Sequence, residues 1–335
     1  MDGVAVAGTL VVDTIKMIDG YPEKGMIADI SGISRGIGGC AANTACGVKL
    51  LDPFIPVKSL GLVGDDDNGT FVIEQLSGYG IDAAGIQRTP LAATSFSDVM
   101  TIESTGERTF FHDRGACRLF APEHVDLDRL DVRLMLLGYG ALLDSMDRAD
   151  GEYGTIMARF LHDVKERGIL TAMDVASTRG AERMKQLVLP SLKYTDYLIV
   201  NEIEGGMLAG IDPRDANGKL ERERLPEICR KLKESGVAKW VVIHAPELGC
   251  AVDEEGTYFE EPSLKLPEGY VVGAVGAGDA FCAGVLYSIY KELSVREALR
   301  MGAATAAANL SAGDAIGGLR SVSETRKLYE AYGVK

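Results

Sequence analysis

The chain has 335 residues, and 46% of them are hydrophobic, which is enough apolar material for one large α/β domain or for a large domain with a small satellite. Its formal net charge of −14 argues against nucleic acid or an anionic membrane as a partner, since both would require a basic surface. No apolar run approaches the roughly 18 residues of a membrane span, and the six cysteines form no CxxC pair. We therefore expect a soluble protein of the reducing cytoplasm.

Short apolar runs of strand length alternate with longer amphipathic stretches along the chain. The stretch 153–167, for example, carries its apolar side chains at helical spacing. This alternation predicts a parallel sheet covered by helices, and hence an α/β fold. The predicted strands are residues 4–7, 134–137, 169–173, 197–200 and 240–243.

Two early segments, 14–35 and 94–113, interrupt this alternation. They carry polar and β-branched residues in near alternation and contain no long helix. We predict that they form a small, half-exposed sheet that projects as a lid, and a lid excludes water from a reaction that water would spoil. The predicted division is a core of residues 1–13, 36–93 and 114–335 with a lid made of the two early segments.

A glycine cluster follows the first lid segment and precedes a predicted helix. Read literally, Gly36, Gly38 and Ala41 match the GxGxxG/A fingerprint of dinucleotide sites, which leaves an NAD(P)-dependent oxidoreductase as one alternative. The residues before the cluster are polar, however, and the next acid comes too early for that fingerprint. We favour a site where a polyhydroxy ligand approaches the glycine backbone and Asn43 supplies a donor and an acceptor. A tight turn that opens a packed helix is the structural alternative.

Polar side chains follow several of the predicted strands. Asp13 comes just after the first strand, and Asp65 lies in an acidic turn, for which a solvated turn is the alternative. Asn201 and Glu204 follow the fourth predicted strand at a spacing that lets them share a face. Because ligands of α/β folds bind at the carboxyl ends of strands, this pair could hold water molecules around a Mg²⁺ ion. The pattern Asn-x-x-Glu is equally typical of a helix capping box.

The most informative feature is the turn Gly276-Ala277-Gly278-Asp279, which comes directly before a helical stretch of small residues. The apolar residues 271–275 predict a strand that runs into this turn. Such a turn presents unpaired N–H groups at the positive end of a helix, where a phosphate or an oxyanion is held. The aspartate is then either a helix cap or a catalytic carboxylate.

Taken together, these motifs make the chain resemble the ribokinase-like (PfkB) carbohydrate kinase family over nearly its whole length. The two most specific elements are the cluster Gly-Gly-x-x-x-Asn, which ends at Asn43, and the Gly-Ala-Gly-Asp turn. The resemblance implies a three-layer αβα Rossmann-like core with a small β-sheet lid. It further implies phosphorylation of a small carbohydrate with ATP and Mg²⁺ as cofactors, and a homodimer formed through the small sheet.

The resemblance also assigns roles to individual positions. Asp279 would be the general base that takes the proton of the attacking hydroxyl, and the turn 276–278 would form the anion hole. Asn201 and Glu204 would be the motif that holds Mg²⁺ and phosphate, with Glu204 reaching the metal through water. The sugar contacts would be Asp13, Gly38, Gly39, Asn43 and, as a weaker candidate, Asp65.

The chain departs from the family pattern at two places. Gly273-Ala274 stands where relatives commonly have Asp-Thr, so a monovalent-cation site is uncertain here. On the nucleotide side only Gly249 remains of the usual glycine pattern, and Pro246 lacks the N–H that a glycine would offer. Asn309 lies where relatives border the adenine. No GxxxxGK[ST] sequence occurs, which excludes a P-loop kinase.

The identity of the substrate depends on thinner evidence. Arg114, at the end of the second lid segment, could pair with a carboxylate and so select a sugar acid, and a solvated lid edge is the alternative. Neutral sugars and nucleosides stay open. A catalytically inactive sugar-binding regulator of the same fold is the main functional alternative, because the nucleotide side departs from the family pattern. The intact Asp279 argues against it.

Overall fold

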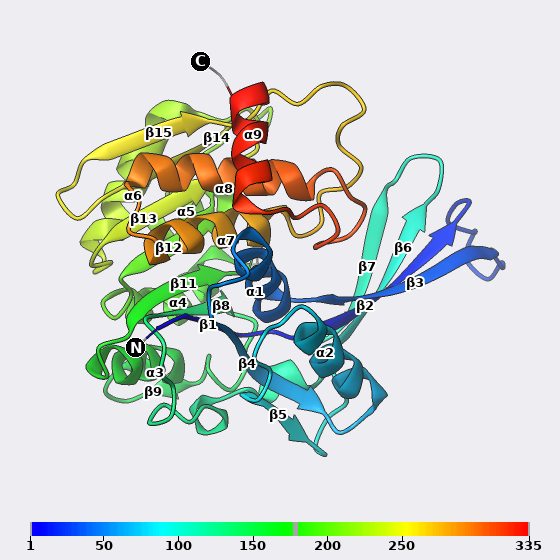
Figure 1. Ribbon diagram of the computed structural model, residues 1–335, viewed down its shortest axis with the longest axis horizontal. Coiled ribbons are helices and arrows are strands. Elements are labelled where there is room, and N and C mark those ends of the chain that lie inside the picture. The colour runs from blue at the N-terminus through cyan, green and yellow to red at the C-terminus, as the bar shows by residue number, and fades with distance from the viewer. Residues whose placement is uncertain (1, 177–179, 334–335) are drawn as a thin grey trace.

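In the computed structural model, which describes residues 2–176 and 180–333, a central sheet carries helices on both faces (Figure 1). Its strands are β1 (Val4–Ala7), β4 (Val57–Gly64), β5 (Ile86–Thr89), β8 (Leu134–Gly140), β11 (Leu170–Val175), β12 (Tyr197–Asn201), β13 (Trp240–His244), β14 (Leu248–Val252) and β15 (Tyr258–Pro262). Their order is β15-β14-β13-β12-β11-β8-β1-β4-β5. Neighbours from β5 to β13 are parallel, whereas β14 and β15 join antiparallel.

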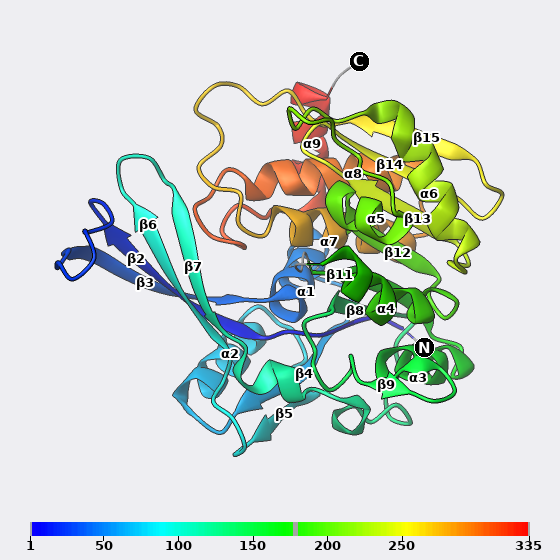
Figure 2. The same cartoon turned by 180° about the vertical axis from the view of Figure 1, so that it is seen from behind.

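Helices cover both faces of this sheet, which explains why its strands read as continuous apolar runs. In β1, Val4 and Val6 pack into one hydrophobic cluster and Ala5 and Ala7 into another, and all four are fully buried. The first cluster lies under α1 (Cys40–Leu51), α2 (Asp67–Gly78), α7 (Ala277–Tyr290), α8 (Val295–Asn309) and α9 (Val322–Tyr332). The second lies under α3 (Ile156–Glu166), α4 (Ala181–Leu192), α5 (Glu202–Ala209) and α6 (Leu225–Glu234), seen from behind in Figure 2. The predicted three-layer αβα core is confirmed.

The predicted elements agree well with the observed ones. The five predicted strands correspond to β1, β8, β11, β12 and β13, and the predicted helix 153–167 corresponds to α3. That helix begins after Thr155, whose hydroxyl accepts a hydrogen bond from the N–H of Ala158 at 3.1 Å. Within the described residues, no helix combines the length and the apolar character needed to cross a bilayer. The short elements are β9 (Ala149–Asp150), β10 (Gly154–Thr155) and the 3₁₀ turns Gly115–Leu119, Pro122–His124 and Arg222–Arg224.

A separate four-stranded sheet projects from one side of the core (Figures 1 and 2). Its strands, in spatial order, are β3 (Ile30–Gly38), β2 (Val11–Ile18), β6 (Phe96–Ile102) and β7 (Arg108–Asp113). β2 pairs in parallel with β6, and the other two pairs are antiparallel. These strands come from the two predicted lid segments, 14–35 and 94–113. Two of them run past the predicted boundaries, because β2 begins before residue 14 and β3 ends after residue 35.

The strand expected at residues 271–275 is not formed. Residues 271–274 have no regular structure, and the side chains of Val271 and Val272 are 53% and 60% exposed. The N–H of Val272 donates to the carbonyl of Leu310 at 2.8 Å, so this segment pairs with the end of α8 and not with a strand. The prediction of a strand before the glycine turn is therefore wrong, although the helix after the turn is present.

Candidate active site

Two side chains from distant parts of the sequence meet at the starts of α1 and α7. Asn43 lies in the first turn of α1 and Asp279 in the first turn of α7, and both side chains are buried. The amide Nδ2 of Asn43 donates to Oδ2 of Asp279 at 2.8 Å. The hydroxyl of Tyr139, near the end of β8, donates to the same oxygen at 3.0 Å. The structure thus joins the two glycine motifs of the sequence in one site.

The glycine turn gives α7 an open N-terminus. Gly276 has φ of +76°, and a Cβ at this position would lie 2.7 Å from Cβ of Ala315, so both the backbone and the space require glycine. Asp279 does not cap its own helix, since its carboxylate bonds to Asn43 and Tyr139. Among the described residues, the N–H groups of Gly278 and Asp279 have no acceptor. Two free donors at the positive end of a 14-residue helix are suited to bind an anion.

A cavity of about 340 Å³ opens over this helix start. It extends from the carboxylate of Asp279 to the ends of the neighbouring strands β11, β12 and β13. Its lining is largely polar and consists of Tyr139, Asp174, Val175, Ala176, Asn201, Glu204, His244, Ala274, Gly276, Ala277, Gly278 and Asp279. The base candidate and the anion site therefore face the same space.

An apolar cavity of about 470 Å³ adjoins the first one. The two share five lining residues, which are Asn201, His244, Ala274, Ala277 and Gly278. The remaining lining is mostly aliphatic and aromatic, and it comes from α7, α8 and the segment after β15, with Phe281, Leu264 and Leu310 among its members. An extended ligand with one apolar end and one anionic end could occupy both cavities at once.

The acids around the polar cavity are held in a low-dielectric environment. Burial raises the pKa of the Asp279 carboxyl to about 6, while the hydrogen bonds from Asn43 and Tyr139 lower it and the charge of Asp13 raises it. Burial also raises the pKa of Asp174, and the nearby carboxylates of Glu204 and Asp279 raise it further. The carboxyl groups of Asp279, Asp174 and Glu204 therefore lie close enough for their charges to interact.

Asn201 and Glu204 form a capping box at the start of α5. The side chain of Asn201 accepts from the N–H of Glu204 at 2.8 Å, and the carboxylate of Glu204 accepts from the N–H of Asn201 at 3.0 Å. Both residues also line the polar cavity. These hydrogen bonds show that the pattern Asn-x-x-Glu is a helix capping box. The same two side chains also lie where a ligand in the cavity could reach them.

Asp13 and the first glycine cluster lie at the base of the small sheet. The carboxylate of Asp13 packs directly over Gly38, and Gly39 has φ of +84°, where a Cβ would lie 2.5 Å from the carbonyl oxygen of Thr9. Burial raises the pKa of Asp13. A narrow space between the sheet and the core is lined by Asp13, Ile15, Gly36, Ile37, Val99, Arg108, Phe110, Val275, Asp314 and Ala315.

The dinucleotide alternative for this glycine cluster is wrong. The strand that leads into it is β3, an exposed antiparallel strand of the small sheet, whereas the fingerprint requires a buried strand of the parallel sheet. The helix that follows, α1, carries Asn43 into the site beside Asp279. The cluster therefore lacks the structural setting of a dinucleotide site and leads instead to the hydrogen bond between Asn43 and Asp279.

Two charged residues that the sequence analysis proposed as sugar contacts, Asp65 and Arg114, lie outside these cavities. The side chain of Asp65 is 70% exposed and lies 3.6 Å from Arg88, while its neighbour Asp66 caps α2. Arg114 pairs with Asp144 at 2.7 Å and donates to the carbonyl of Leu142, so its guanidinium is directed to the core surface. In this structure neither residue lines the space around Asp279, because a closer partner holds each of them.

The two residues expected on the nucleotide side also do not reach the apolar cavity. Gly249 lies inside β14 with Phe281 and Leu299 against it. Asn309 is fully buried at the end of α8, and its amide donates to the carbonyl of Ala315 at 2.8 Å. Asn309 thus supports the loop that packs on Gly276, which is a structural task.

Three side chains at the site were missed by the sequence analysis. Tyr139 and Asp174 lie near the carboxyl ends of β8 and β11, and Arg108 lies on β7 and donates to the carbonyl of Gly313 in the core. The rule that ligands bind at the carboxyl ends of parallel strands would have identified the first two. The face of the small sheet on which Arg108 lies depends on the register of β7, which the sequence does not reveal.

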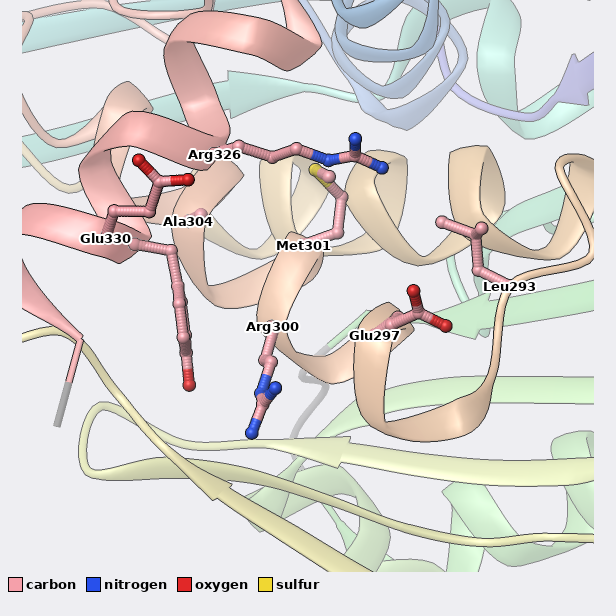
Figure 3. A pocket seen from close by; sticks show the side chains of 8 residues that line it. Leu293, Glu297, Arg300, Met301, Ala304, Arg326 and Glu330 are labelled. Atoms are coloured by element: carbon pink, nitrogen blue, oxygen red, sulfur yellow. The ribbon is translucent and has the colours of Figure 1, made fainter. Parts of the chain in front are cut away.

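A further cavity of about 270 Å³ lies between α8 and α9 (Figure 3). Charged side chains of both signs surround it, namely Glu297, Arg300, Arg326 and Glu330. Arg300 is already bonded to the buried carboxylate of Glu261 at 3.0 Å. Because the charges around it balance and none of its lining residues belongs to the other cavities, it is not part of the active site.

Known proteins similar to this chain share one type of activity. The profile of the pfkB family of carbohydrate kinases matches residues 1–321. A probable chloroplastic fructokinase-6 of Arabidopsis thaliana is 26% identical over 299 residues, which is 87% of this chain and 71% of the relative. A 2-dehydro-3-deoxygluconokinase of Bacillus subtilis is 26% identical over 312 residues, which is 89% of this chain and 87% of the relative.

Solved structures show the same fold. Ribokinase from Thermotoga maritima superposes with a TM-score of 0.78 at 20% identity, over 98% of this chain and 100% of that chain. The Arabidopsis thaliana ribokinase complexed with ribose and ATP superposes with a TM-score of 0.78 at 22% identity, over 98% of each chain. The likeness extends over both sheets of the molecule.

Proposed function

Because the chain belongs to the pfkB family of carbohydrate kinases, we propose that it transfers the γ-phosphate of ATP to a hydroxyl of a small sugar or sugar acid, with Asp279 as the general base. One observation carries this proposal: a buried carboxylate lies at a helix start beside two N–H groups without acceptors among the described residues. Phosphoryl transfer requires mainly alignment and charge stabilisation, and these groups supply both in one cavity.

In the proposed mechanism the carboxylate of Asp279 takes the proton of the acceptor hydroxyl as that oxygen attacks the γ-phosphorus. The bond from the γ-phosphorus to the bridging oxygen breaks, and ADP leaves with that oxygen. The N–H groups of Gly278 and Asp279 donate to the phosphoryl oxygens as negative charge moves across them. With a pKa of about 6, the base is ionised at neutral pH yet basic enough to accept a proton.

The acceptor sugar would lie between the small sheet and the core. Oδ1 of Asn43 is buried and accepts no hydrogen bond from the described residues, while its amide is directed to Asp279. A buried acceptor without a donor is costly, and a sugar hydroxyl would satisfy it. Asp13, over Gly38, offers a second acceptor on the same side. Gly39 lets the turn before α1 pack closely on Thr9, which holds Asn43 in this position.

The apolar cavity would hold the base of ATP. Its aliphatic and aromatic lining suits a planar ring, and the residues that it shares with the polar cavity would let the phosphates continue to the start of α7. His244 lies between the two cavities, packs on the ring of Phe281 at 4.9 Å and, because burial lowers its pKa to about 4, stays neutral.

The polar cavity also fits a magnesium ion. Asp174 and Glu204 crowd negative charge beside Asp279, and a divalent cation would relieve their repulsion. Within the described chain, no three His, Cys, Asp or Glu side chains form a preformed metal centre, which suits an ion that keeps much of its water. Asn201, Glu204 and Asp174 would hold that water shell. The cation would supply charge neutralisation on the phosphates of ATP.

The acceptor class follows from turnover of a panel of sugars, sugar acids and nucleosides with ATP. We expect ADP release with a small sugar or with a sugar acid such as 2-dehydro-3-deoxygluconate, the substrate in the name of one relative. Thermal shifts measured with a non-hydrolysable ATP analogue would report binding separately, because a bound ligand raises the melting temperature. Binding of an acceptor without any ADP release would instead indicate a sugar-binding regulator.

We further propose a homodimer in the cytoplasm. The free cysteines of the described chain are all buried, as suits a reducing compartment. In the small sheet, Ile33 and Phe111 are 67% and 55% exposed, and the alternation of each strand directs them away from the face of Arg108 and Phe110 that lines the lid space. A second copy of this chain would cover that outer face.

Phe111→Asp is expected to shift the protein from dimer to monomer, because a carboxylate in an apolar interface would be buried without a partner. Sedimentation equilibrium measures this directly. The matched control is Phe54→Asp, since Phe54 is 90% exposed and lies in the loop between α1 and β4 of the core, outside the small sheet. A wild-type protein that sediments as a monomer, or a Phe111→Asp variant that stays dimeric, would contradict this assignment.

A further inference from the structure

Two donors converge on a single oxygen of the Asp279 carboxylate. Asn43 Nδ2 lies 2.8 Å and the Tyr139 hydroxyl 3.0 Å from Oδ2. The other oxygen, Oδ1, accepts no hydrogen bond from the described residues. The carboxylate is therefore asymmetric, since one oxygen is held by two donors and the other is available to a ligand.

The backbone that presents Tyr139 is held in an unfavourable conformation. Its φ is +55°, which is rare for an aromatic residue and costs on the order of 1–3 kcal/mol. Ala141, two residues later, also has a positive φ, of +74°. Strain of this kind persists only where the surrounding structure enforces it, and such positions cluster at functional sites. Here its effect is to place a phenol against the catalytic carboxylate.

No positive charge lies beside the carboxylate of Asp279 among the described residues, so hydrogen bonds are the main interactions that stabilise its ionised form. The titratable groups around it are Asp13 from β2, Asp174 from β11, Glu204 from α5, His244 from β13, Cys40 from α1, Cys282 from α7 and Tyr139 itself. Of these, only His244 could become a cation, and burial lowers its pKa to about 4, so it is neutral at neutral pH. Burial and the charge of Asp279 hold the pKa of Tyr139 well above its ordinary value, so the phenol keeps its proton and remains a donor. Asn43 and Tyr139 are thus the two groups that favour the ionised carboxylate.

We propose that Tyr139 is a positioning residue for the phosphoryl transfer: by donating to Oδ2 of Asp279 it fixes the rotation of the carboxylate so that Oδ1 takes the proton of the acceptor hydroxyl. The proposal rests on the role of Asp279 as the base. Tyr139 neither gains nor loses a proton in the step. It acts before the reaction, by reducing the number of orientations that the base can adopt.

Tyr139→Phe tests this role, because it removes the hydroxyl and keeps the ring. We expect kcat to fall by about ten- to a hundredfold, as for the loss of a hydrogen bond to a charged group, with KM for the sugar changed by less than about twofold. The acid limb of the kcat profile should move to higher pH, since the carboxylate loses a donor that favours its ionised form. Tyr329→Phe is the matched control, because its hydroxyl also donates to a carboxylate, Glu261, at 3.1 Å but outside the active site.

The midpoint of the acid limb is an apparent pKa that is read from relative rates at different pH values. A loss of folded enzyme that is equal at every pH does not move it. A Tyr139→Phe enzyme whose acid limb stays at the wild-type pH would overturn the proposal, even if kcat fell, because the tyrosine would then be merely structural. A raised KM at unchanged kcat would overturn it as well. Failure of the underlying base assignment has a different signature, in which Asp279→Asn keeps wild-type kcat.

Discussion

Replacing Asp279 by asparagine is expected to lower kcat by about 10²–10⁴-fold, the usual contribution of a well-placed general base, and to change sugar affinity little. The asparagine keeps the size of the side chain and an oxygen for Asn43 and Tyr139, but it cannot accept a proton. Steady-state kinetics under saturating ATP measure this split between kcat and KM. For the wild type, kcat should fall as the pH drops below about 6, where the carboxyl becomes protonated.

The control for this substitution is Asp128→Asn, which removes a carboxylate that is 84% exposed and pairs with Arg167. It should leave kcat unchanged. A general base usually contributes at least about a hundredfold to the rate. If Asp279→Asn retained more than about a tenth of the wild-type kcat, the proton would therefore have another acceptor.

The same asparagine variant should also be more stable than the wild type at pH 8. Burial holds the pKa of Asp279 at about 6 in the folded chain, above the ordinary 3.8, so folding favours the protonated carboxyl. That contribution is fully present below about pH 4 and is lost as the pH rises through 6. A shift of this size corresponds to on the order of 3 kcal/mol at roughly 1.4 kcal/mol per pKa unit. Melting temperatures at pH 5 and pH 8 should show a gap between variant and wild type that widens at the higher pH.

Gly276→Ala is expected to reduce kcat by at least about 10²-fold, which is the effect of losing one donor of an oxyanion hole. The added Cβ would lie 2.7 Å from Cβ and 2.9 Å from Cα of Ala315, so the turn must move, and the N–H groups of Gly278 and Asp279 move with it. Because Ala315 also lines the space between the small sheet and the core, the loss should appear in kcat and in KM for either substrate. Kinetics with each substrate varied in turn measure both.

Gly256→Ala separates the two causes of that loss. Gly256 has φ of +81°, close to the +76° of Gly276, but no atom lies within 4 Å of the Cβ that would be added there. Both variants pay the cost of a positive φ, about 1–2 kcal/mol, and only Gly276→Ala adds a steric clash in the site. Equal activity of the two variants would show that the turn does not hold the phosphate.

Much of the fold was predictable because its strands are buried on both faces and are therefore apolar throughout. Residues 271–275 have the same composition but lie exposed beside the end of α8, and composition alone cannot separate a strand from an apolar loop. At the site, the glycine turn and Asn43 carry enough local chemistry to be recognised. Asp65 and Arg114 were proposed as substrate contacts because of their charge. The direction of a charged side chain depends on its nearest partner, however. Arg88 lies beside Asp65, and Asp144 pairs with Arg114.

Tyr139 illustrates a different limit of sequence reasoning. Nothing in its neighbourhood along the chain indicates a positive φ, and its partner Asp279 lies 140 residues away. Only the closing of the sheet brings the two together. The strand order of the sheet thus determines which side chains at the ends of the strands contact one another.

The hydrogen bond between Asn43 and Asp279 spans 236 residues of sequence. During synthesis on the ribosome, Asn43 therefore emerges long before Asp279. Nascent chains that end before Asp279 therefore lack the proposed base, however well their early strands have folded. Closing so long a loop also carries an entropic cost that the later helices must offset. If Asp279 is the base, premature termination anywhere before α7 should yield a protein that cannot phosphorylate a sugar.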